Sequence, residues 1–471
     1  MHFVLRFELG ENIAVLLAFT RDDEKRRASA LLTPRIPAFH AKTIHLLLIA
    51  TALHVALTVA LLCVGKLQLF PAGLSANGLS DALGSDSALH YQSEVESLAD
   101  LLHKGEAGAW FHRPAELHVK LYSLSFALFS QWTTFNVLTV EPLNLLYYLV
   151  ILILIYGLAR LVFDSRAGLV AAVMVALWPS FLLHTTQLLR DPLVIIATLV
   201  LMLSAAQWLT RTNSWRQAFP SVLGTVIAVA TIWFVRASMW YMVPLILLLT
   251  LLLLVARQLR EKRVLLVNLS CVLLVLVTVT FLPKALSPSR PKLTQDIPRA
   301  PKLWQRIAST RRRASEESLI ESGSNIDADV RFDGVLDIVR YSPRAVIIGL
   351  FAPFPNMWFT PGQHVGMLGK LLAGIETLLT YIIELLCVVG FWQRRQQFAS
   401  WLLLSTAVLG AGAVGLVMVN VGAIYRLRYS FWMLLVVLGS GGLVRVFSKA
   451  SKEKKAQPQL PHSPCDEAHA R

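Results

Sequence analysis

Two aspartates in this 471-residue chain stand just outside long apolar stretches, where a carboxylate can act on a substrate at a membrane surface. Asp86 lies in a polar loop after the first apolar stretch, and Asp191 stands before Pro192, where one stretch ends and the next begins. A carboxylate can take the proton from an attacking hydroxyl group, or it can hold a divalent metal ion beside the reacting atoms. We therefore predict that Asp86 and Asp191 are catalytic, and that both are the ligands if a divalent ion (Mg or Mn) takes part.

Arginines close to the apolar stretches indicate that the substrate carries a phosphate group. A guanidinium group pairs with phosphate oxygens through two parallel hydrogen bonds, and a lipid-linked sugar presents its phosphate at the bilayer surface. The arginines predicted to lie on the same side as the aspartates are Arg190, Arg236, Arg426 and Arg428. The basic run 299–313 is a further candidate for phosphate contacts.

Each of these residues also has an ordinary structural explanation. Asp191 could cap the helix that starts at Pro192, because an aspartate there satisfies backbone N–H groups and the helix dipole. Asp86 could be a solvated loop residue, and any one of the arginines could extend toward lipid headgroups. The catalytic interpretation depends on the order of features along the whole chain.

The composition is typical of a polytopic, all-α membrane protein. Hydrophobic residues make up 55% of the chain and charged residues 15%, whereas soluble domains are roughly 45–50% apolar. Stretches of about 20 apolar residues recur, which is the length that crosses ~30 Å of hydrocarbon. About ten such spans are predicted, at residues 44–64, 142–159, 167–189, 192–210, 217–235, 237–256, 264–283, 371–393, 399–420 and 429–447.

The net charge of +15 is explained by basic gaps between the spans, and no nucleic-acid partner is predicted. Cationic residues gather, for example, at 257–263 and 445–455. Because short cytoplasmic loops are enriched in Lys and Arg, these gaps are placed in the cytoplasm. The ends that carry Asp191, Arg236 and Tyr425 then face outward.

Two regions resist a simple alternation of spans. Residues 284–343 fall on the outer side although they contain eleven Lys or Arg residues, which is tolerated because long loops cross the membrane largely regardless of charge. Arg344 to Phe359 is apolar but short, and Pro353 and Pro355 interrupt it, so we predict a re-entrant or interfacial segment there.

The first outer loop, 65–141, is predicted to contain two helices that lie on the membrane surface. Residues 87–103 place leucines and a valine near helical spacing, and residues 118–132 mix aromatic and polar side chains. Aromatic residues prefer the membrane interface, which suits the second helix.

The order of these features resembles the GT-C superfamily of integral membrane glycosyltransferases, and most closely the protein O-mannosyltransferases and the aminoarabinose lipid A transferase. The features that carry the resemblance are Asp86 followed by His90 and Tyr91, then the two loop helices, the basic turn 160–166 and Asp191-Pro192. Near the end, the segment 425–429 (YRLRY) resembles the Arg-Tyr segment before a late span in such enzymes. The resemblance covers residues 44–283 and 420–445.

The resemblance implies further substrate-binding residues. They are His90, Tyr91, Glu116 and Tyr429, beside Arg190, Arg236, Arg426 and Arg428. Ser87 follows Asp86 where a second acidic residue is often found, which weakens the case for a metal site. The loop 284–343 has no counterpart, so the acceptor is not implied.

The leading functional hypothesis is a glycosyltransferase that moves a sugar from a polyprenyl-phosphate donor to an acceptor on the outer face, namely a glycan, a lipid or a protein. One alternative is a polysaccharide polymerase or ligase that uses polyprenyl-diphosphate glycans. Another is a flippase or transporter of lipid-linked glycans, because Glu384 lies in the middle of the span 371–393, where a lone carboxylate usually faces a partner or a water-filled cavity.

The predicted organisation begins with a basic cytoplasmic tail and ends with another. The parts are the tail 1–43, the core 44–283, the outer loop and re-entrant segment 284–370, the last spans 371–447 and the tail 448–471. The charges at 21–27 argue against a cleavable signal peptide, and the four cysteines have no paired spacing. We expect a protein of the bacterial inner membrane, in contact with its lipids, with the active site on the outer face.

Overall fold

The computed structural model describes residues 41–71, 73–80, 88–130, 132, 134–286, 302–321, 325–359 and 366–456. The chain divides into two units, Met1–Leu48 and Ile49–Arg471. Of the first unit only the start of one helix is described. All other described elements belong to the second unit.

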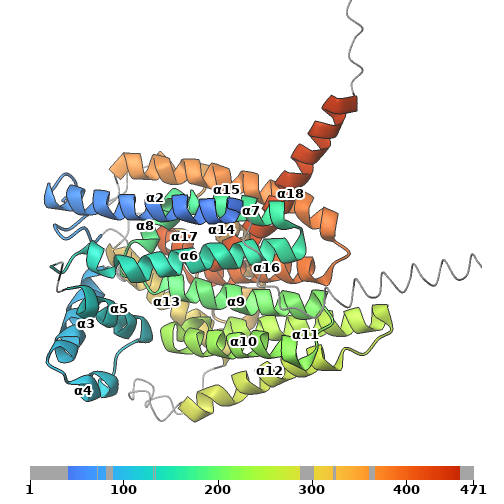
Figure 1. The fold of residues 1–471 in the computed structure, drawn as a ribbon, viewed down its shortest axis with the longest axis horizontal. Coiled ribbons are helices and arrows are strands. Elements are labelled where there is room, and N and C mark those ends of the chain that lie inside the picture. Colours follow the sequence, from blue (N-terminus) through green and yellow to red (C-terminus); the bar gives the residue numbers. More distant parts are fainter. Residues whose placement is uncertain are drawn as a thin grey trace, which may run out of the picture. The chain divides into compact units, whose positions relative to one another are not determined.

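The described residues form helices, with two isolated β-bridges and no strand, which confirms the predicted all-α class (Figure 1). In the first half of the chain the helices are α2 (Ala41–Lys66), α3 (Ala88–His103), α4 (Ala107–His112), α5 (Leu117–Phe129), α6 (Val137–Val162), α7 (Ser165–Ala176), α8 (Pro179–Thr185), α9 (Asp191–Thr210), α10 (Trp215–Val235), η1 (Ala237–Tyr241), α11 (Met242–Glu261) and α12 (Leu266–Leu286). In the second half they are α13 (Leu303–Glu321), α14 (Val335–Phe351), η3 (Pro355–Met357), α15 (Gly366–Arg394), α16 (Phe398–Val417), α17 (Val421–Leu427) and α18 (Tyr429–Ala456).

Eight helices in the described part are long and apolar enough to cross a membrane, and a bent pair makes nine. The difference from the ten predicted spans lies in two places. The predicted span 167–189 is broken into α7 and α8, whose axes differ by 70°. The predicted span 264–283 corresponds to α12, which is apolar but shorter over its described length.

The break between α7 and α8 follows from local chemistry. The side chain of Asp164 caps the start of α7 by accepting a hydrogen bond from the Ala167 N–H at 2.9 Å. Pro179 has no backbone N–H to continue α7, but it fits the first turn of a new helix. The chain therefore changes direction at Trp178 and delivers the segment 186–190 to the start of α9.

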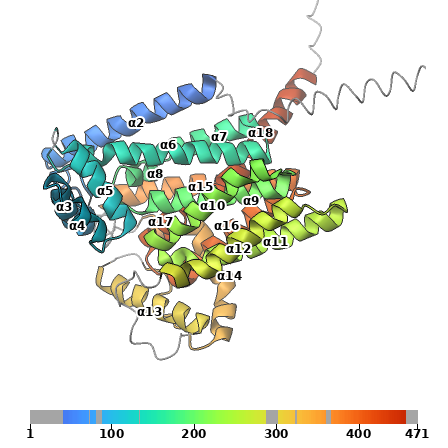
Figure 2. The same cartoon turned by 60° about the horizontal axis from the view of Figure 1, so that its bottom comes forward.

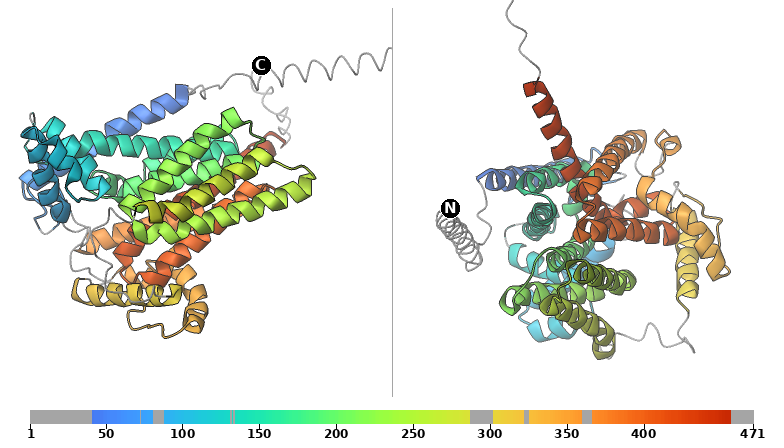
Figure 3. Two further views of the ribbon diagram at one scale, coloured as in Figure 1. Left: turned by 90° about the horizontal axis from the view of Figure 1, so that it is seen from below. Right: turned by 90° about the vertical axis from the view of Figure 1, so that its right-hand side faces the viewer.

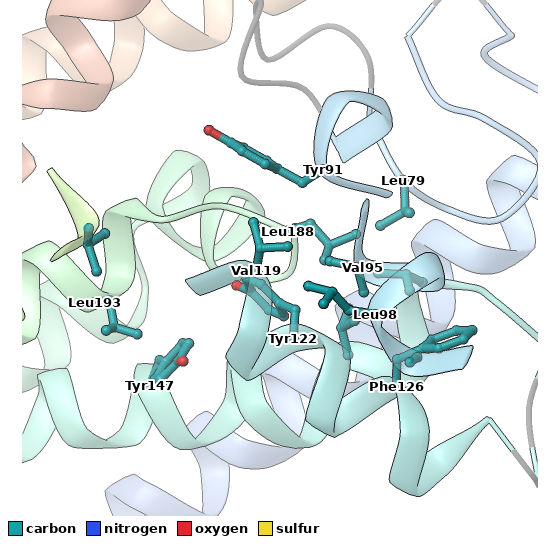
Figure 4. Packing of buried hydrophobic residues seen from close by; sticks show 14 of the residues in the cluster. Leu79, Tyr91, Val95, Leu98, Val119, Tyr122, Phe126, Tyr147, Leu188 and Leu193 are labelled. Atoms are coloured by element: carbon teal, nitrogen blue, oxygen red, sulfur yellow. The ribbon is translucent and has the colours of Figure 1, made fainter. Parts of the chain in front are cut away.

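The helices of the first loop pack on the span that follows them. α3 and α5 lie side by side and share a buried cluster with α6 and the start of α9, which Figure 4 shows from close by. Val95 and Leu98 come from α3, and Val119 and Tyr122 from α5. Each fully buried large apolar side chain stabilises such a contact by about 1.5–3 kcal/mol. The loop is thus a fixed cap on the start of α9.

Small residues let the later helices approach closely. α14 crosses α16 where Gly349 and Gly415 leave no room for a Cβ atom against the facing backbone, and α15 crosses α18 in the same way at Gly390 and Gly442. Close backbone approach of this kind is typical of helix packing in membranes. Figures 2 and 3 show these later helices, coloured orange to red, as neighbours.

The regions that resisted a simple alternation of spans are partly helical. The predicted loop 284–343 contains α13 and the start of α14. The segment Arg344–Phe359 consists of the end of α14, a turn and η3, and α14 does not meet the length and apolarity of a span.

Candidate active site

Asp191 is the centre of a buried cluster of charges. Its Oδ1 atom accepts a hydrogen bond from Arg236 Nη1 at 2.5 Å, and its Oδ2 atom lies 3.1 Å from Arg426 Nε. Asp191 is only 5% exposed, and the two arginines are each 9% exposed. Because buried charges are stable only when they are paired, the three side chains hold one another in place.

The three residues come from three separate helices. Asp191 is the first residue of α9, Arg236 follows the end of α10, and Arg426 lies in the short helix α17. α9 and α10 are joined by a short turn and pack together, so the end of α10 returns to the start of α9. Asn420 begins α17 by accepting a hydrogen bond from the Gly422 N–H at 2.8 Å.

A second group of predicted residues extends this cluster toward the loop helices. Arg190 Nη1 lies 3.6 Å from Glu116 Oε2, and the same oxygen lies 3.4 Å from His118 Nδ1. The His118 ring packs edge-on against the ring of Tyr91 at 4.6 Å between centroids. The structure therefore brings together six of the predicted residues, whose catalytic and binding roles stay predictions: Tyr91, Glu116, Arg190, Asp191, Arg236 and Arg426.

The segment before Asp191 is anchored by polar contacts to the first loop. The Gln187 Oε1 atom accepts a hydrogen bond from the Ser80 N–H at 2.8 Å. The Tyr122 hydroxyl lies 3.1 Å from the Leu189 carbonyl oxygen and 2.8 Å from Asn144 Oδ1. These contacts fix the backbone on which Arg190 and Asp191 are carried.

Two predicted residues lie outside what the structure describes. Asp86 falls in the segment 81–87, which is not described, and the side chain of His90 is not described although its backbone belongs to α3. The described residues on either side are Ser80, bound to Gln187, and Tyr91, packed on His118.

The Asp191 cluster carries more positive than negative charge. Three guanidinium groups, of Arg190, Arg236 and Arg426, lie with two carboxylates, of Asp191 and Glu116. The Glu116 side chain is 48% exposed, so solvent weakens its contribution. An excess of guanidinium groups at a protected site favours an anion as the partner.

A network next to the cluster supports the helix that carries Arg426. The Tyr425 hydroxyl donates to Glu376 Oε2 at 2.5 Å, and the Ser180 N–H donates to Glu376 Oε1 at 2.7 Å. The Ser180 and Tyr429 hydroxyl oxygens lie 2.6 Å apart. Burial and the charge of Glu376 raise the pKa of Tyr425, so its hydroxyl stays protonated and donates.

His184 was not predicted from the sequence, yet it lies beside both groups. Its ring packs edge-on against Tyr429 at 5.6 Å, and it interacts electrostatically with Asp191 and Arg426. Its Nδ1 atom is 2.5 Å from the Ser180 carbonyl oxygen and therefore carries the proton. A histidine in an apolar stretch gives no signal in the sequence until the bend between α7 and α8 is known. In the sequence, Glu376 is visible only as an acidic residue within a predicted span. Tyr425 is visible only as a tyrosine next to Arg426.

Arg428 is placed differently from the other predicted arginines. Its Nη1 atom donates to the carbonyl oxygens of Leu350 at 3.0 Å and Ala352 at 2.5 Å, at the end of α14. It also lies over the Tyr425 ring, 4.4 Å from the centroid. These contacts satisfy carbonyl groups that a helix end leaves without partners. A phosphate contact from Arg428 stays a prediction, as does a substrate contact from Tyr429.

The surroundings of Asp191 do not fit a divalent metal ion. Both of its carboxylate oxygens face guanidinium groups, and a metal would have to displace them. Among the described residues no group of three or more His, Cys, Asp or Glu side chains has metal-binding geometry. A metal at this site stays a prediction that depends on Asp86.

Glu384, the residue behind the transporter alternative, lies away from the Asp191 cluster. Neither carboxylate oxygen has a hydrogen-bond partner among the described residues. The side chain lines a cavity of about 10 Å³ together with Arg428 and Trp432. A cavity of that size is at the lower limit for one water molecule.

Comparison with known proteins supports the predicted family. Residues 149–299 match the family model of the oligosaccharyl transferase STT3, N-terminal, and this range contains Arg190, Asp191 and Arg236. No curated protein matches the chain. A solved structure, that of ArnT from Cupriavidus metallidurans bound to undecaprenyl phosphate, is similar at a TM-score of 0.35 and 16% identity, over 88% of this chain and 81% of that chain. The family match covers about a third of the chain, and over residues 149–299 it agrees with the resemblance to the GT-C superfamily of membrane glycosyltransferases seen in the sequence.

Proposed function

We propose that this protein is a glycosyltransferase that moves a sugar from a polyprenyl-phosphate donor to an acceptor on the outer face of the bacterial cytoplasmic membrane. The observation that carries the proposal is the buried cluster in which Asp191 orders Arg236 and Arg426, with Arg190 beside it. Such a cluster fits the phosphate of a lipid-linked donor at the end of the spans.

The chemistry follows from charge development in the transfer. An acceptor hydroxyl oxygen bonds to the anomeric carbon while the bond from that carbon to the phosphate oxygen breaks. Negative charge then grows on the leaving polyprenyl phosphate, and fixed guanidinium groups stabilise it without reorganisation. Asp191 keeps the guanidinium groups of Arg236 and Arg426 in position for this task.

The acceptor proton needs a base, and we assign this role to Asp86. The supporting observation concerns its described neighbours: Ser80 and Tyr91 contact Gln187 and His118 at the same end of the bundle as Asp191. A divalent metal ion at Asp86 would assist the same step, although Ser87 stands where a second acidic residue is often found.

The test is a mass-spectrometric profile of polyprenyl-linked sugars in membranes that contain Asp86→Asn or Asp191→Asn in place of the parent protein. Accumulation of one polyprenyl-phosphate sugar is expected in both, and its mass names the donor. Glu317→Gln serves as control, because this exposed side chain on α13 lies outside the cluster.

Each other outcome favours a stated alternative. Accumulation of a polyprenyl-diphosphate oligosaccharide would favour a polymerase or ligase. Unchanged pools in both aspartate variants, at normal expression, would reject transfer at this site. A defect confined to Glu384→Gln would then favour the flippase or transporter, for which the unpartnered carboxylate in its cavity is the supporting observation.

A further inference from the structure

A cavity of about 450 Å³ lies between α13 and the segment 328–332. This volume falls within the roughly 300–1,000 Å³ of small-molecule sites. In the sequence this region is visible only as a basic loop. Figure 2 shows α13 next to α14, and α13 also packs against α16.

The floor of the cavity is held rigidly by Arg311. This arginine is 2% exposed, and its guanidinium group donates to the carbonyl oxygens of Val330 at 3.1 Å, Leu416 at 3.0 Å and Asp327 at 2.7 Å. It also lies over the Phe332 ring at 5.3 Å. All three guanidinium nitrogens of Arg311 therefore bind protein carbonyl groups and hold the cavity in shape.

The cavity is joined to the helix that carries Arg426. The Ile326 N–H donates to the Val419 carbonyl oxygen at 3.0 Å, and Asn325 pairs with Asn420, the residue that caps α17. A few residues of backbone thus connect the segment 328–332, which lines the cavity, with Arg426, which binds Asp191. A ligand in the cavity would lie on the side of the protein where α17 begins.

Four ionisable side chains at the cavity have no partner among the residues that the structure describes. Arg312, Glu316, Asp329 and Arg331 line it and are exposed, and within the described part of the chain they take part in no hydrogen bond or ion pair. Two are cationic and two anionic, so the group has no net charge. Ser315 adds a hydroxyl group, which itself donates to the Ala328 carbonyl oxygen at 2.6 Å.

We propose that this cavity binds the acceptor of the transfer and that the bound part is a neutral, polyhydroxylated sugar unit. The proposal rests on the proposed function. A sugar hydroxyl can donate to a carboxylate and accept from a guanidinium group at once, which uses both kinds of side chain. A phosphate or another polyanion would be repelled by the carboxylates of Glu316 and Asp329, and a polycation would be repelled by Arg312 and Arg331.

The chain supplies a matched control for each side chain. Arg313 and Glu317 neighbour Arg312 and Glu316 on α13, are exposed, and do not line the cavity. The double variant Arg312→Ala/Glu316→Ala is therefore compared with Arg313→Ala/Glu317→Ala, which removes the same two charges from the same helix.

The measurement uses full-length protein in nanodiscs, its natural donor, and as acceptor the envelope glycan fraction isolated from a strain that lacks the protein. The cavity variant is expected to raise the KM for the acceptor about tenfold, while kcat and the KM for the donor stay within twofold of the parent. The control variant is expected to keep all three constants.

The other results separate the two proposals. An unchanged acceptor KM, or the same change in the control variant, would overturn the acceptor site and leave the transferase standing. A fall in kcat with constant acceptor KM would mean that the cavity is only structural. Lack of any transfer by the parent protein, with unchanged lipid pools in Asp191→Asn, would instead reject the proposed function itself.

Discussion

Arg236 and Asp191 are 45 residues apart in the chain, and their Nη1 and Oδ1 atoms lie 2.5 Å apart where α9 begins and α10 ends, opposite the turn that joins the two helices. Arg426, from the other end of the chain, approaches the second carboxylate oxygen at 3.1 Å. One carboxylate thus orders two guanidinium groups, and the arrangement explains why both arginines are buried.

Removing one partner of the Asp191–Arg236 pair leaves the other charge buried without compensation. Arg236→Gln is expected to lower stability by about 3–5 kcal/mol. The double variant Arg236→Gln/Asp191→Asn is expected to recover part of the loss, because both charges are gone. Thermal unfolding in nanodiscs measures both. If the losses of stability in Arg236→Gln and Asp191→Asn simply add in the double variant, the pair does not interact.

Tyr425→Phe tests whether the network around Glu376 positions Arg426. The change leaves the Glu376 carboxylate with one hydrogen bond fewer, which costs roughly 1–3 kcal/mol at a buried site. We expect the KM for the donor to rise several-fold while the acceptor KM is constant. Tyr381→Phe is the control, since its hydroxyl donates to the Phe351 carbonyl oxygen and, among the described residues, not to Glu376. A kinetic effect of the same size in the control would contradict the positioning role.

Glu384→Gln distinguishes transfer from transport. Its carboxylate accepts no hydrogen bond from a described residue and does not belong to the Asp191 cluster, so the glycosyltransferase proposal expects normal sugar transfer by the glutamine variant. Product glycan is measured in cells that produce this variant. A loss of product at normal expression would show that Glu384 takes part in function.

Cysteine labelling tests the sidedness of α13. Thr310→Cys, at an exposed position, is expected to react with an impermeant thiol reagent in intact spheroplasts. Lys449→Cys, near the end of α18, is expected to react only after lysis. Both variants require Cys63→Ser and Cys465→Ser. Labelling of position 310 only after lysis would place α13 inside and reverse the predicted topology.

Asp327 gives a prediction about pH. Burial acts to raise its pKa, but hydrogen bonds from Arg344 and Tyr341 and the charges of Arg344 and Arg311 outweigh burial and lower it below the usual 3.8. A lowered pKa contributes stability above the unfolded value, and this contribution is lost as the pH falls through the folded value. Asp327→Asn is therefore expected to lower the melting temperature by a few degrees at pH 7, and the difference should shrink below about pH 4. A constant difference from pH 7 to pH 3 would contradict this assignment.

Local pattern was enough to predict the spans and the loop helices. The predicted helices at 87–103 and 118–132 correspond to α3 and α5, and Asp191 begins α9 beside Pro192 as expected. These features depend on apolar length and on nearby residues. The broken span was missed because the bend at Trp178-Pro179 interrupts a stretch that stays apolar throughout.

By itself the sequence determined that this chain is an all-α membrane protein with acidic and basic residues at the ends of its spans, because hydrophobic length and charge are local properties. Only the tertiary structure decided which charges meet. It paired Asp191 with Arg236 and Arg426. In the folded chain Arg428 donates hydrogen bonds to the carbonyl groups at the end of α14, and His184 and Glu376 lie beside the site. Contacts between distant residues depend on how helices pack. That packing is set by the combined fit of many side chains, and no short segment contains it.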